Sequence, residues 1–86
     1  MFHCLKVHPK YWNALVSGKK LFEVRFNDRN FSVGDSLFLE EFDPEFGYMG
    51  RCYSVVVTYV LSGFEGLAPG YVVLGIQRSS CAFGVS

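Results

Sequence analysis

The stretch SGKKLFEVRF, residues 17–26, is where the apolar pattern of the chain changes from a helical period to a strand period. Gly18 is the residue type that most readily takes the left-handed conformation at a helix C-terminus. After it, Phe22, Val24 and Phe26 recur at a period of two, which is typical of a strand. The stretch therefore predicts the end of a helix and then a half-buried strand with Glu23 and Arg25 on the face opposite the phenylalanines.

The residues before this stretch predict a strand and a short helix. Residues 2–7 are an apolar-rich run that His8-Pro9 interrupts. Proline suits the first turn of a helix, where its missing N–H costs nothing. Residues 11–16 then place their apolar side chains at helical spacing. A strand over 2–7 and a helix that begins at Pro9 follow from this pattern.

The residues after the stretch predict three further strands, at 36–42, 51–61 and 71–77. Polar or glycine-rich connections at 27–30, 43–47 and 63–70 separate them. Short strands in so small a chain favour a closed or nearly closed barrel, because closure removes exposed strand edges. We expect an α+β, mainly β fold: a small β-barrel of about five to six strands with one helix after the first strand. Residues 1–77 are assigned to a single domain and 78–86 to a C-terminal tail.

The charge balance limits the kinds of function. Eight basic residues stand against eight acidic ones, so the formal net charge is zero. A protein that holds nucleic acid over a broad surface needs an excess of Lys and Arg to neutralise phosphates. Any role with RNA must therefore rest on a local site, or on recognition of a base, nucleoside or nucleotide.

The cysteines and histidines predict no metal site and no cofactor. Cys4, Cys52 and Cys81 lack CxxC spacing, and with two histidines they form no zinc pattern. Reduced and mostly packed thiols are the expectation. There is no secretion signal and no apolar run of membrane-spanning length. We expect a cytoplasmic protein with no membrane contact.

Residues 18–25 resemble the GxKxxExR signature of ASCH domains, which belong to the PUA-like superfamily. Further blocks resemble a small bacterial and phage family that carries a domain of unknown function, DUF3850: His3, and residues 5–7, 27–29, 33–35, 59–61, 63–67 and 69–75. The resemblance covers about residues 3–77. It implies a small β-barrel with a helix against it and a cleft near the signature residues.

The resemblance also implies a ligand, because the superfamily is associated with RNA binding and with recognition of modified bases. Glu23 offers acceptors for an exocyclic amine, and Arg25 offers paired hydrogen bonds to a base edge or a phosphate. Lys20 offers positive charge to a phosphate. From spacing alone, the alternative is an ion pair on a solvated strand face, which would contribute little.

Four further residues complete the predicted ligand site: His8, Asn27, Arg29 and Glu65. His8 flanks the cleft at the helix start. Asn27 and Arg29 either contact the ligand at the rim or belong to a turn whose side chains bond their own backbone. Glu65 comes from the glycine-rich loop 63–70, and we expect it to approach Lys20. For stacking on a base, the sequence offers Tyr48, Tyr71 or Phe64.

Two other functions stay open. One ASCH relative is an amidohydrolase that removes the acetyl group from N4-acetylcytidine; it resembles this chain at Lys20 but has a threonine nucleophile where this chain has Glu23. In an enzymatic interpretation Lys20 and Glu23 would be the acid and base, and no other catalytic residue is assigned. The third function is contact with a protein partner through an apolar loop around Phe46, Tyr48 and Met49.

Overall fold

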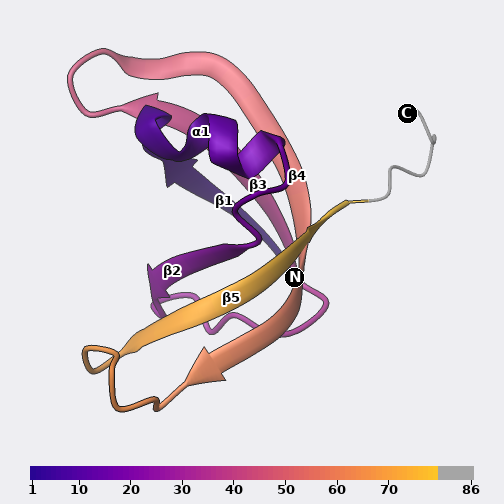
Figure 1. The fold of residues 1–86 in the computed structure, drawn as a ribbon, viewed down its shortest axis with the longest axis vertical. Coiled ribbons are helices and arrows are strands. Elements are labelled where there is room, and N and C mark those ends of the chain that lie inside the picture. The colour runs from indigo at the N-terminus through magenta and orange to yellow at the C-terminus, as the bar shows by residue number, and fades with distance from the viewer. Residues whose placement is uncertain (80–86) are drawn as a thin grey trace.

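Five strands form one sheet that curls into a half-barrel (Figure 1). The computed structural model describes residues 1–79. In chain order the elements are β1 (Phe2–Val7), α1 (Pro9–Val16), β2 (Phe22–Phe26), β3 (Ser36–Asp43), β4 (Gly47–Ser62) and β5 (Tyr71–Arg78). The strand order is β1-β3-β4-β5-β2, with β1 parallel to β3 and the other pairs antiparallel. The mainly β fold with one helix after the first strand is confirmed.

The half-barrel stays open between its two edge strands. Within residues 1–79 no backbone ladder joins β1 to β2. The helix α1 follows β1 and lies over the concave side of the sheet, where it packs against β3 (Figure 1). The open edge and the start of α1 are therefore brought to the same side of the molecule.

The element boundaries differ most from expectation at β4, which begins at Gly47 rather than at residue 51. The Asp43 carboxylate accepts the backbone N–H groups of Glu45 and Phe46, at 2.8 and 3.2 Å. Gly47 then takes a positive φ of 86°, a conformation that glycine adopts without strain. This tight turn lets β4 pair with the end of β3 from its first residue.

The C-terminal boundary also shifts. Arg78 was assigned to the tail, but it is the last residue of β5, where it pairs with Val55. Residues 80–86, the rest of the predicted tail, lie outside the described residues.

The core fills the concave side between the sheet and α1. Its buried side chains come from every strand except β2, with Trp12 and Leu15 from the helix. The full set is Leu5, Val7, Trp12, Leu15, Phe31, Leu37, Leu39, Val55, Val57, Val72, Leu74 and Ile76. Burying a large aliphatic or aromatic side chain contributes about 1.5–3 kcal/mol, so this cluster supplies most of the driving force for folding.

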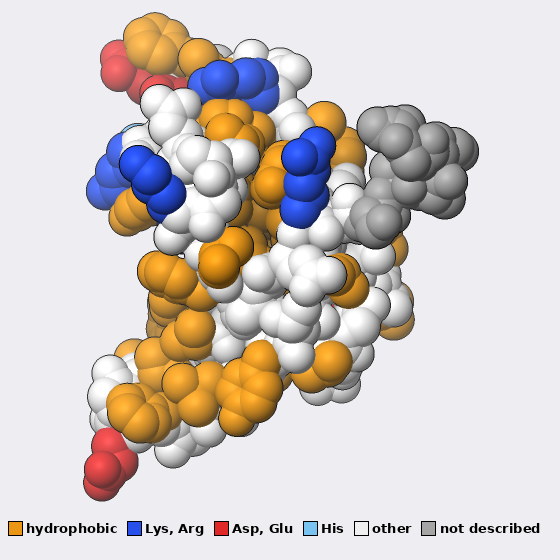
Figure 2. Space-filling model, turned by 45° about the vertical axis from the view of Figure 1, so that its right-hand side comes forward, with side chains coloured by type: hydrophobic (Ala, Val, Ile, Leu, Met, Phe, Trp, Pro, Cys, Tyr) orange, Lys and Arg blue, Asp and Glu red, His pale blue; other side chains and the backbone are white. Residues whose placement is uncertain are grey.

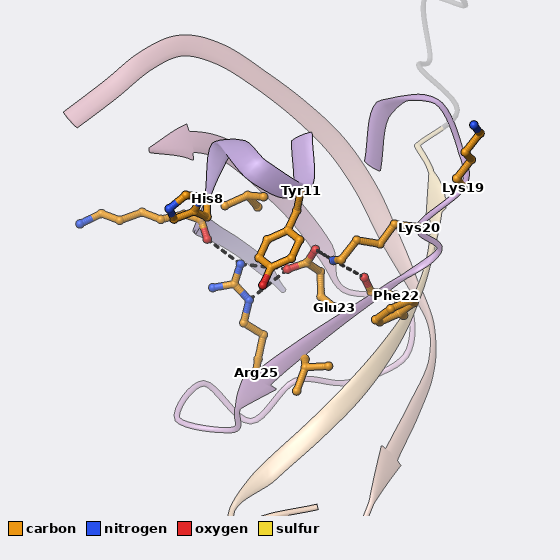
Figure 3. Close-up of a pocket in the computed structure, with 10 residues that line it drawn as sticks. His8, Tyr11, Lys19, Lys20, Phe22, Glu23 and Arg25 are labelled. Carbon is orange, nitrogen blue, oxygen red and sulfur yellow. Dashed lines mark hydrogen bonds and ion pairs between the residues drawn. The ribbon is translucent and has the colours of Figure 1, made fainter. Parts of the chain in front are cut away.

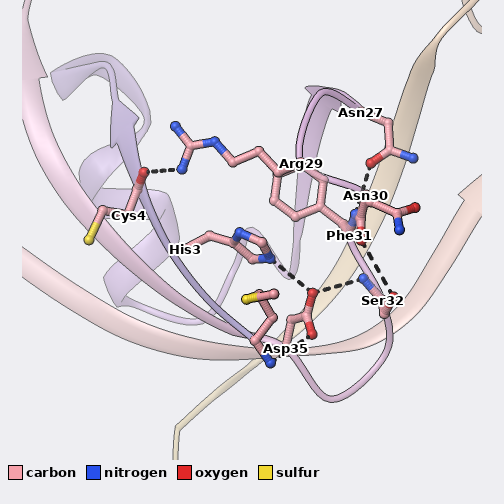
Figure 4. Close-up of polar contacts among 9 residues, drawn as sticks. His3, Cys4, Asn27, Arg29, Asn30, Phe31, Ser32 and Asp35 are labelled. Atoms are coloured by element: carbon pink, nitrogen blue, oxygen red, sulfur yellow. Dashed lines mark hydrogen bonds and ion pairs between the residues drawn. The ribbon is translucent and has the colours of Figure 1, made fainter.

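A buried polar group lies at the base of β1 (Figure 4). The Asp35 carboxylate accepts a hydrogen bond from His3 Nε2 at 2.9 Å and one from the backbone N–H of Ser32 at 3.0 Å. The Met1 ammonium lies 3.2 Å from its other oxygen. The hydrogen bond from His3 is the main reason that the pKa of Asp35 is held below its ordinary value.

We expect the free energy of unfolding to fall as the pH drops below about 4. A carboxyl whose pKa is lowered in the folded state stabilises the fold above its ordinary pKa, and that contribution is lost once acid protonates it. Asp35 behaves in this way, and so does Glu41, whose pKa is lowered by its hydrogen bonds from Arg51. Urea unfolding between pH 7 and pH 2 measures the effect. An Asp35→Asn variant with the same pH dependence as the native protein would contradict the assignment to Asp35.

Three further expectations concern membrane-spanning segments, metal binding and the cysteines. No helix in the described part of the chain is long and apolar enough to cross a membrane. Within residues 1–79, no group of three or more His, Cys, Asp or Glu side chains is arranged to hold a metal ion. The expectation of packed thiols is wrong for Cys4 and Cys52, which are free and exposed because each occupies an outward position of its strand. Cys81 lies outside the described residues.

Candidate functional site

A cleft of about 550 Å³ opens at the edge of the half-barrel, where the end of β1, the start of α1 and β2 meet (Figure 3). The residues between α1 and β2 complete its wall. Its lining residues are Lys6, Val7, His8, Tyr11, Lys19, Lys20, Phe22, Glu23, Val24 and Arg25.

The strand β2 turns its charged face inward. Glu23 is only 4% exposed, whereas Phe22, Val24 and Phe26 are each about half exposed on the outer face. The inward face does not meet the apolar core, because β2 lies at the edge of the sheet beside the cleft. A carboxylate can be buried at this position because it is paired with two cations.

The centre of the cleft is a three-residue ionic cluster around Glu23 (Figure 3). Lys20 Nζ donates to Glu23 Oε2 at 2.5 Å and to the backbone carbonyl of Phe22 at 2.7 Å. Arg25 Nη2 donates to Glu23 Oε1 at 3.0 Å. Both carboxylate oxygens are therefore occupied, and Glu23 holds the two cations in place.

Two arginines also donate hydrogen bonds to backbone carbonyls at the open edge of β1. Arg25 Nη2 donates to the carbonyl of Lys6 at 2.6 Å, and Arg29 Nη1 donates to the carbonyl of Cys4 at 2.8 Å (Figure 4). Strand edges leave such carbonyls without a partner. These two side-chain hydrogen bonds take the place of part of the backbone ladder that β1 and β2 do not form. Arg25 therefore both binds the edge of β1 and lines the cleft.

The residues that line the cleft carry an excess of positive charge. Four of the eight basic residues line it, and only one of the eight acidic residues does. The formal charge of the lining is therefore +3 with His8 neutral, in a molecule whose net charge is zero. A concave, partly enclosed site with such an excess attracts anions.

The helix start brings an aromatic ring to the cleft. His8 is the N-cap of α1, and its Nδ1 accepts the backbone N–H of Lys10 at 3.1 Å. This fixes the first turn, from which Tyr11 reaches toward Glu23 and Arg25 (Figure 3). Lys20 Nζ lies 5.5 Å from the centre of the Tyr11 ring, within the range of a cation–π contact.

The structure brings together four of the residues predicted for the site, Lys20, Glu23, Arg25 and His8. Three others do not line the cleft. Asn27 uses its Oδ1 to accept the backbone N–H of Phe31, as expected for a turn residue (Figure 4). Arg29 bonds to β1, and Glu65 is exposed in the loop 63–70.

The aromatic and basic residues of the cleft were partly missed by sequence reasoning. Tyr48, Tyr71 and Phe64 are not among the lining residues, and Tyr11 takes the place foreseen for one of them. Lys6 and Lys19 also line the cleft. The N-cap at His8 was a usable signal for Tyr11, since it places the first helical turn beside the strand end. No local signal pointed to Lys6.

Comparison with known proteins gives a family match over nearly the whole chain. Residues 2–76 match the model of a domain of unknown function, DUF3850. The chain is also similar to an uncharacterized 12.9 kDa protein from the GpA 3′ region of Escherichia phage P2, with 46% identity over 39 residues. The aligned segment covers 45% of this chain and 36% of the phage protein, so the chain spans little more than a third of that relative.

Proposed function

This chain belongs to the DUF3850 family, and we propose that it is a binding protein whose cleft takes a phosphate-bearing nucleotide, either free or as part of RNA. The observation that supports this proposal is the excess of positive charge: four cations and one buried, fully engaged carboxylate line a cleft of a neutral protein. We also assign the family to the ASCH group of the PUA-like superfamily, on the signature formed by Gly18, Lys20, Glu23 and Arg25.

The donors left free in the cluster suit a phosphate. Arg25 Nη1 has no hydrogen-bond partner among residues 1–79, and Lys20 uses only two of its three N–H groups. Guanidinium and ammonium groups form the strong, charge-assisted hydrogen bonds that phosphate oxygens accept. Glu23 holds these donors in position, which reduces the cost of ordering them when a ligand binds.

Tyr11 supplies a surface for the base. Its ring is partly exposed and lies at the cleft wall beside the cationic cluster. Stacking of a base on an aromatic side chain contributes about 1–3 kcal/mol and tolerates different bases. Phosphate contacts from the cluster and stacking on Tyr11 together match the two ends of a nucleotide.

The chemistry of the lining favours binding over hydrolysis. None of the lining residues carries a serine or threonine hydroxyl or a cysteine thiol that could attack an amide. The only carboxylate of the lining has both oxygens occupied by Lys20 and Arg25. A carboxylate that accepts hydrogen bonds from two cations is engaged in holding them, which favours a role in binding.

A second candidate function, contact with a protein partner, is supported by the turn between β3 and β4. Phe46 in this turn and Tyr48 and Met49 at the start of β4 are all exposed. Replacing Tyr48 and Met49 by polar residues, followed by pull-down from a cell extract, tests this function, and recovery of the same proteins by both forms would count against it.

We expect the Lys6→Gln/Lys19→Gln double variant to bind nucleoside 5′-monophosphates about tenfold more weakly than the native protein. Each lysine contributes charge to the rim of the cleft, and a tenfold change corresponds to about 1.4 kcal/mol. Neither lysine takes part in the ionic cluster or in an ion pair among the described residues. Amide NMR titrations with the monophosphates and with a short single-stranded RNA give the affinities.

The matched control is Arg78→Gln, which removes a positive charge at the end of β5, outside the cleft. It should leave the affinity nearly unchanged, while shifts on binding should cluster at β2 and the start of α1. Unphosphorylated nucleosides that bind as tightly as the monophosphates would contradict the proposed role of the cations.

A further inference from the structure

The outer face of β2, β5 and β4 carries a continuous set of uncharged side chains, which we call the apolar face. Its members stand opposite one another across the three strands in two full rows and one shorter row. These are Phe22, Gly75 and Tyr59; Val24, Val73 and Leu61; and Phe26 with Tyr71. Figure 2 shows hydrophobic side chains gathered over the lower part of the molecule, near the connection between β4 and β5. None of the eight residues is charged.

The apolar face is open to solvent. The five largest of its exposed side chains, Phe22, Val24, Phe26, Tyr59 and Tyr71, are between 40% and 62% exposed. A contiguous patch of this kind is as large as the largest apolar patch of a typical soluble monomer, and such patches are often functional. A fully covered aromatic side chain buries roughly 150–250 Å². The four rings of the face are each about half exposed, and with Val24, Leu61 and Val73 they offer roughly 500–600 Å².

We propose that this face binds a second copy of the chain, face to face, in a weak two-fold dimer. Two such faces would bury roughly 1,000–1,200 Å² in total, which reaches the lower limit for a specific interface. The face carries no charge, so it needs no oppositely charged partner, and a two-fold contact places the same uncharged patch on both sides. The net charge of zero removes overall repulsion between the copies.

The shape of the face suits packing between two sheets. Gly75 lies between Phe22 and Tyr59 and leaves the centre of that row without a side chain. Thr58 and Tyr59 border this position closely, since a Cβ at Gly75 would lie 3.1 Å from Thr58 Oγ1 and 3.3 Å from Tyr59 Cβ. The rings of Phe22 and Tyr59 on either side are the parts of this row that can interdigitate with a partner sheet, and sheets that pack face to face align their strands within about 30°. Phe22 and Val24 also line the cleft, so the partner copy would border its mouth.

Sedimentation equilibrium over protein concentrations from the low micromolar to the millimolar range tests the proposal. We expect the mass to rise from 9.7 kDa toward twice that value as the concentration increases. Val24→Lys places a charge in the middle of the face and is expected to keep the protein monomeric. Tyr59→Lys, on the opposite strand of the face, should act in the same way, and an amide NMR spectrum of each variant checks that it is folded.

The matched control is Phe46→Lys, which adds the same charge at a side chain that is 75% exposed in the turn between β3 and β4. It should dimerise like the native protein. A native protein that stays at 9.7 kDa at millimolar concentration overturns the proposal, even if another protein is found on the face. Equal loss of association in Val24→Lys and Phe46→Lys overturns it as well.

Discussion

Glu23→Ala is expected to lower the melting temperature of this protein by about 10–20 °C. Glu23 is 4% exposed and is the counter-charge of both Lys20 and Arg25. Removing one member of a buried ionic group leaves the rest unpaired, which costs about 3–5 kcal/mol when all members are buried. The two cations reach solvent in part, so we expect about 2–3 kcal/mol here. Thermal unfolding followed by circular dichroism measures the change.

Two further variants help to interpret the loss of stability in Glu23→Ala. Glu23→Gln keeps the size of the side chain but removes its charge and replaces one of its two acceptor oxygens by an N–H donor, so it separates the loss of the ionic contacts from the loss of packing. Glu65→Ala removes an exposed carboxylate from the loop 63–70 and should change the melting temperature little. A Glu23→Ala protein as stable as Glu65→Ala would show that the cluster does not stabilise the fold.

Trp12→Ala is expected to cost about 3–5 kcal/mol of folding stability, the largest effect of any single change considered for this chain. Trp12 is 3% exposed in the core, and it is the largest side chain that α1 buries. Its ring also lies 5.7 Å from the guanidinium of Arg51, which pairs with the buried Glu41. Because α1 carries His8 and Tyr11 at its start, we expect nucleotide binding to weaken together with stability.

Tyr11→Ala is the control for Trp12→Ala, because it changes the preceding residue of the same helix. Tyr11 is 44% exposed, so its removal should cost less than about 1 kcal/mol while it weakens binding through the lost stacking surface. Urea unfolding gives the stabilities and amide NMR titration gives the affinities. If Trp12→Ala unfolds at the same urea concentration as Tyr11→Ala, the helix does not depend on Trp12 for its place on the sheet.

The helix shows how far local sequence reasoning reaches. Pro9 at its first turn and Gly18 after its end bounded it correctly, and Gly18 takes the positive φ expected of a helix C-terminus. Such signals act within a few residues, through backbone geometry and capping. The bounds of β1 were likewise predicted, because its apolar run ends at His8-Pro9.

The charged stretch shows where local reasoning stops. Alternation placed Glu23 and Arg25 on the face opposite Phe22 and Val24, but a period of two is the same whichever face turns inward. The usual expectation for a half-buried strand is that apolar side chains face the interior. In β2 the charged face turns inward, because this edge strand lies beside the cleft and its carboxylate is neutralised by two cations.

The sequence by itself determined the helix, the presence and order of the five strands along the chain, and the proximity of Lys20, Glu23 and Arg25, since these depend mainly on residues close in the chain. Only the tertiary structure decided that the cluster closes the edge of β1 and that Lys6 and Tyr11 join it. Arg25 reaches the carbonyl of Lys6 across nineteen positions of the chain. That contact exists because the sheet order makes β1 and β2 the two edge strands and its curl brings them together. Strand order depends on how all five strands bury their apolar faces at once, which no short stretch of sequence encodes.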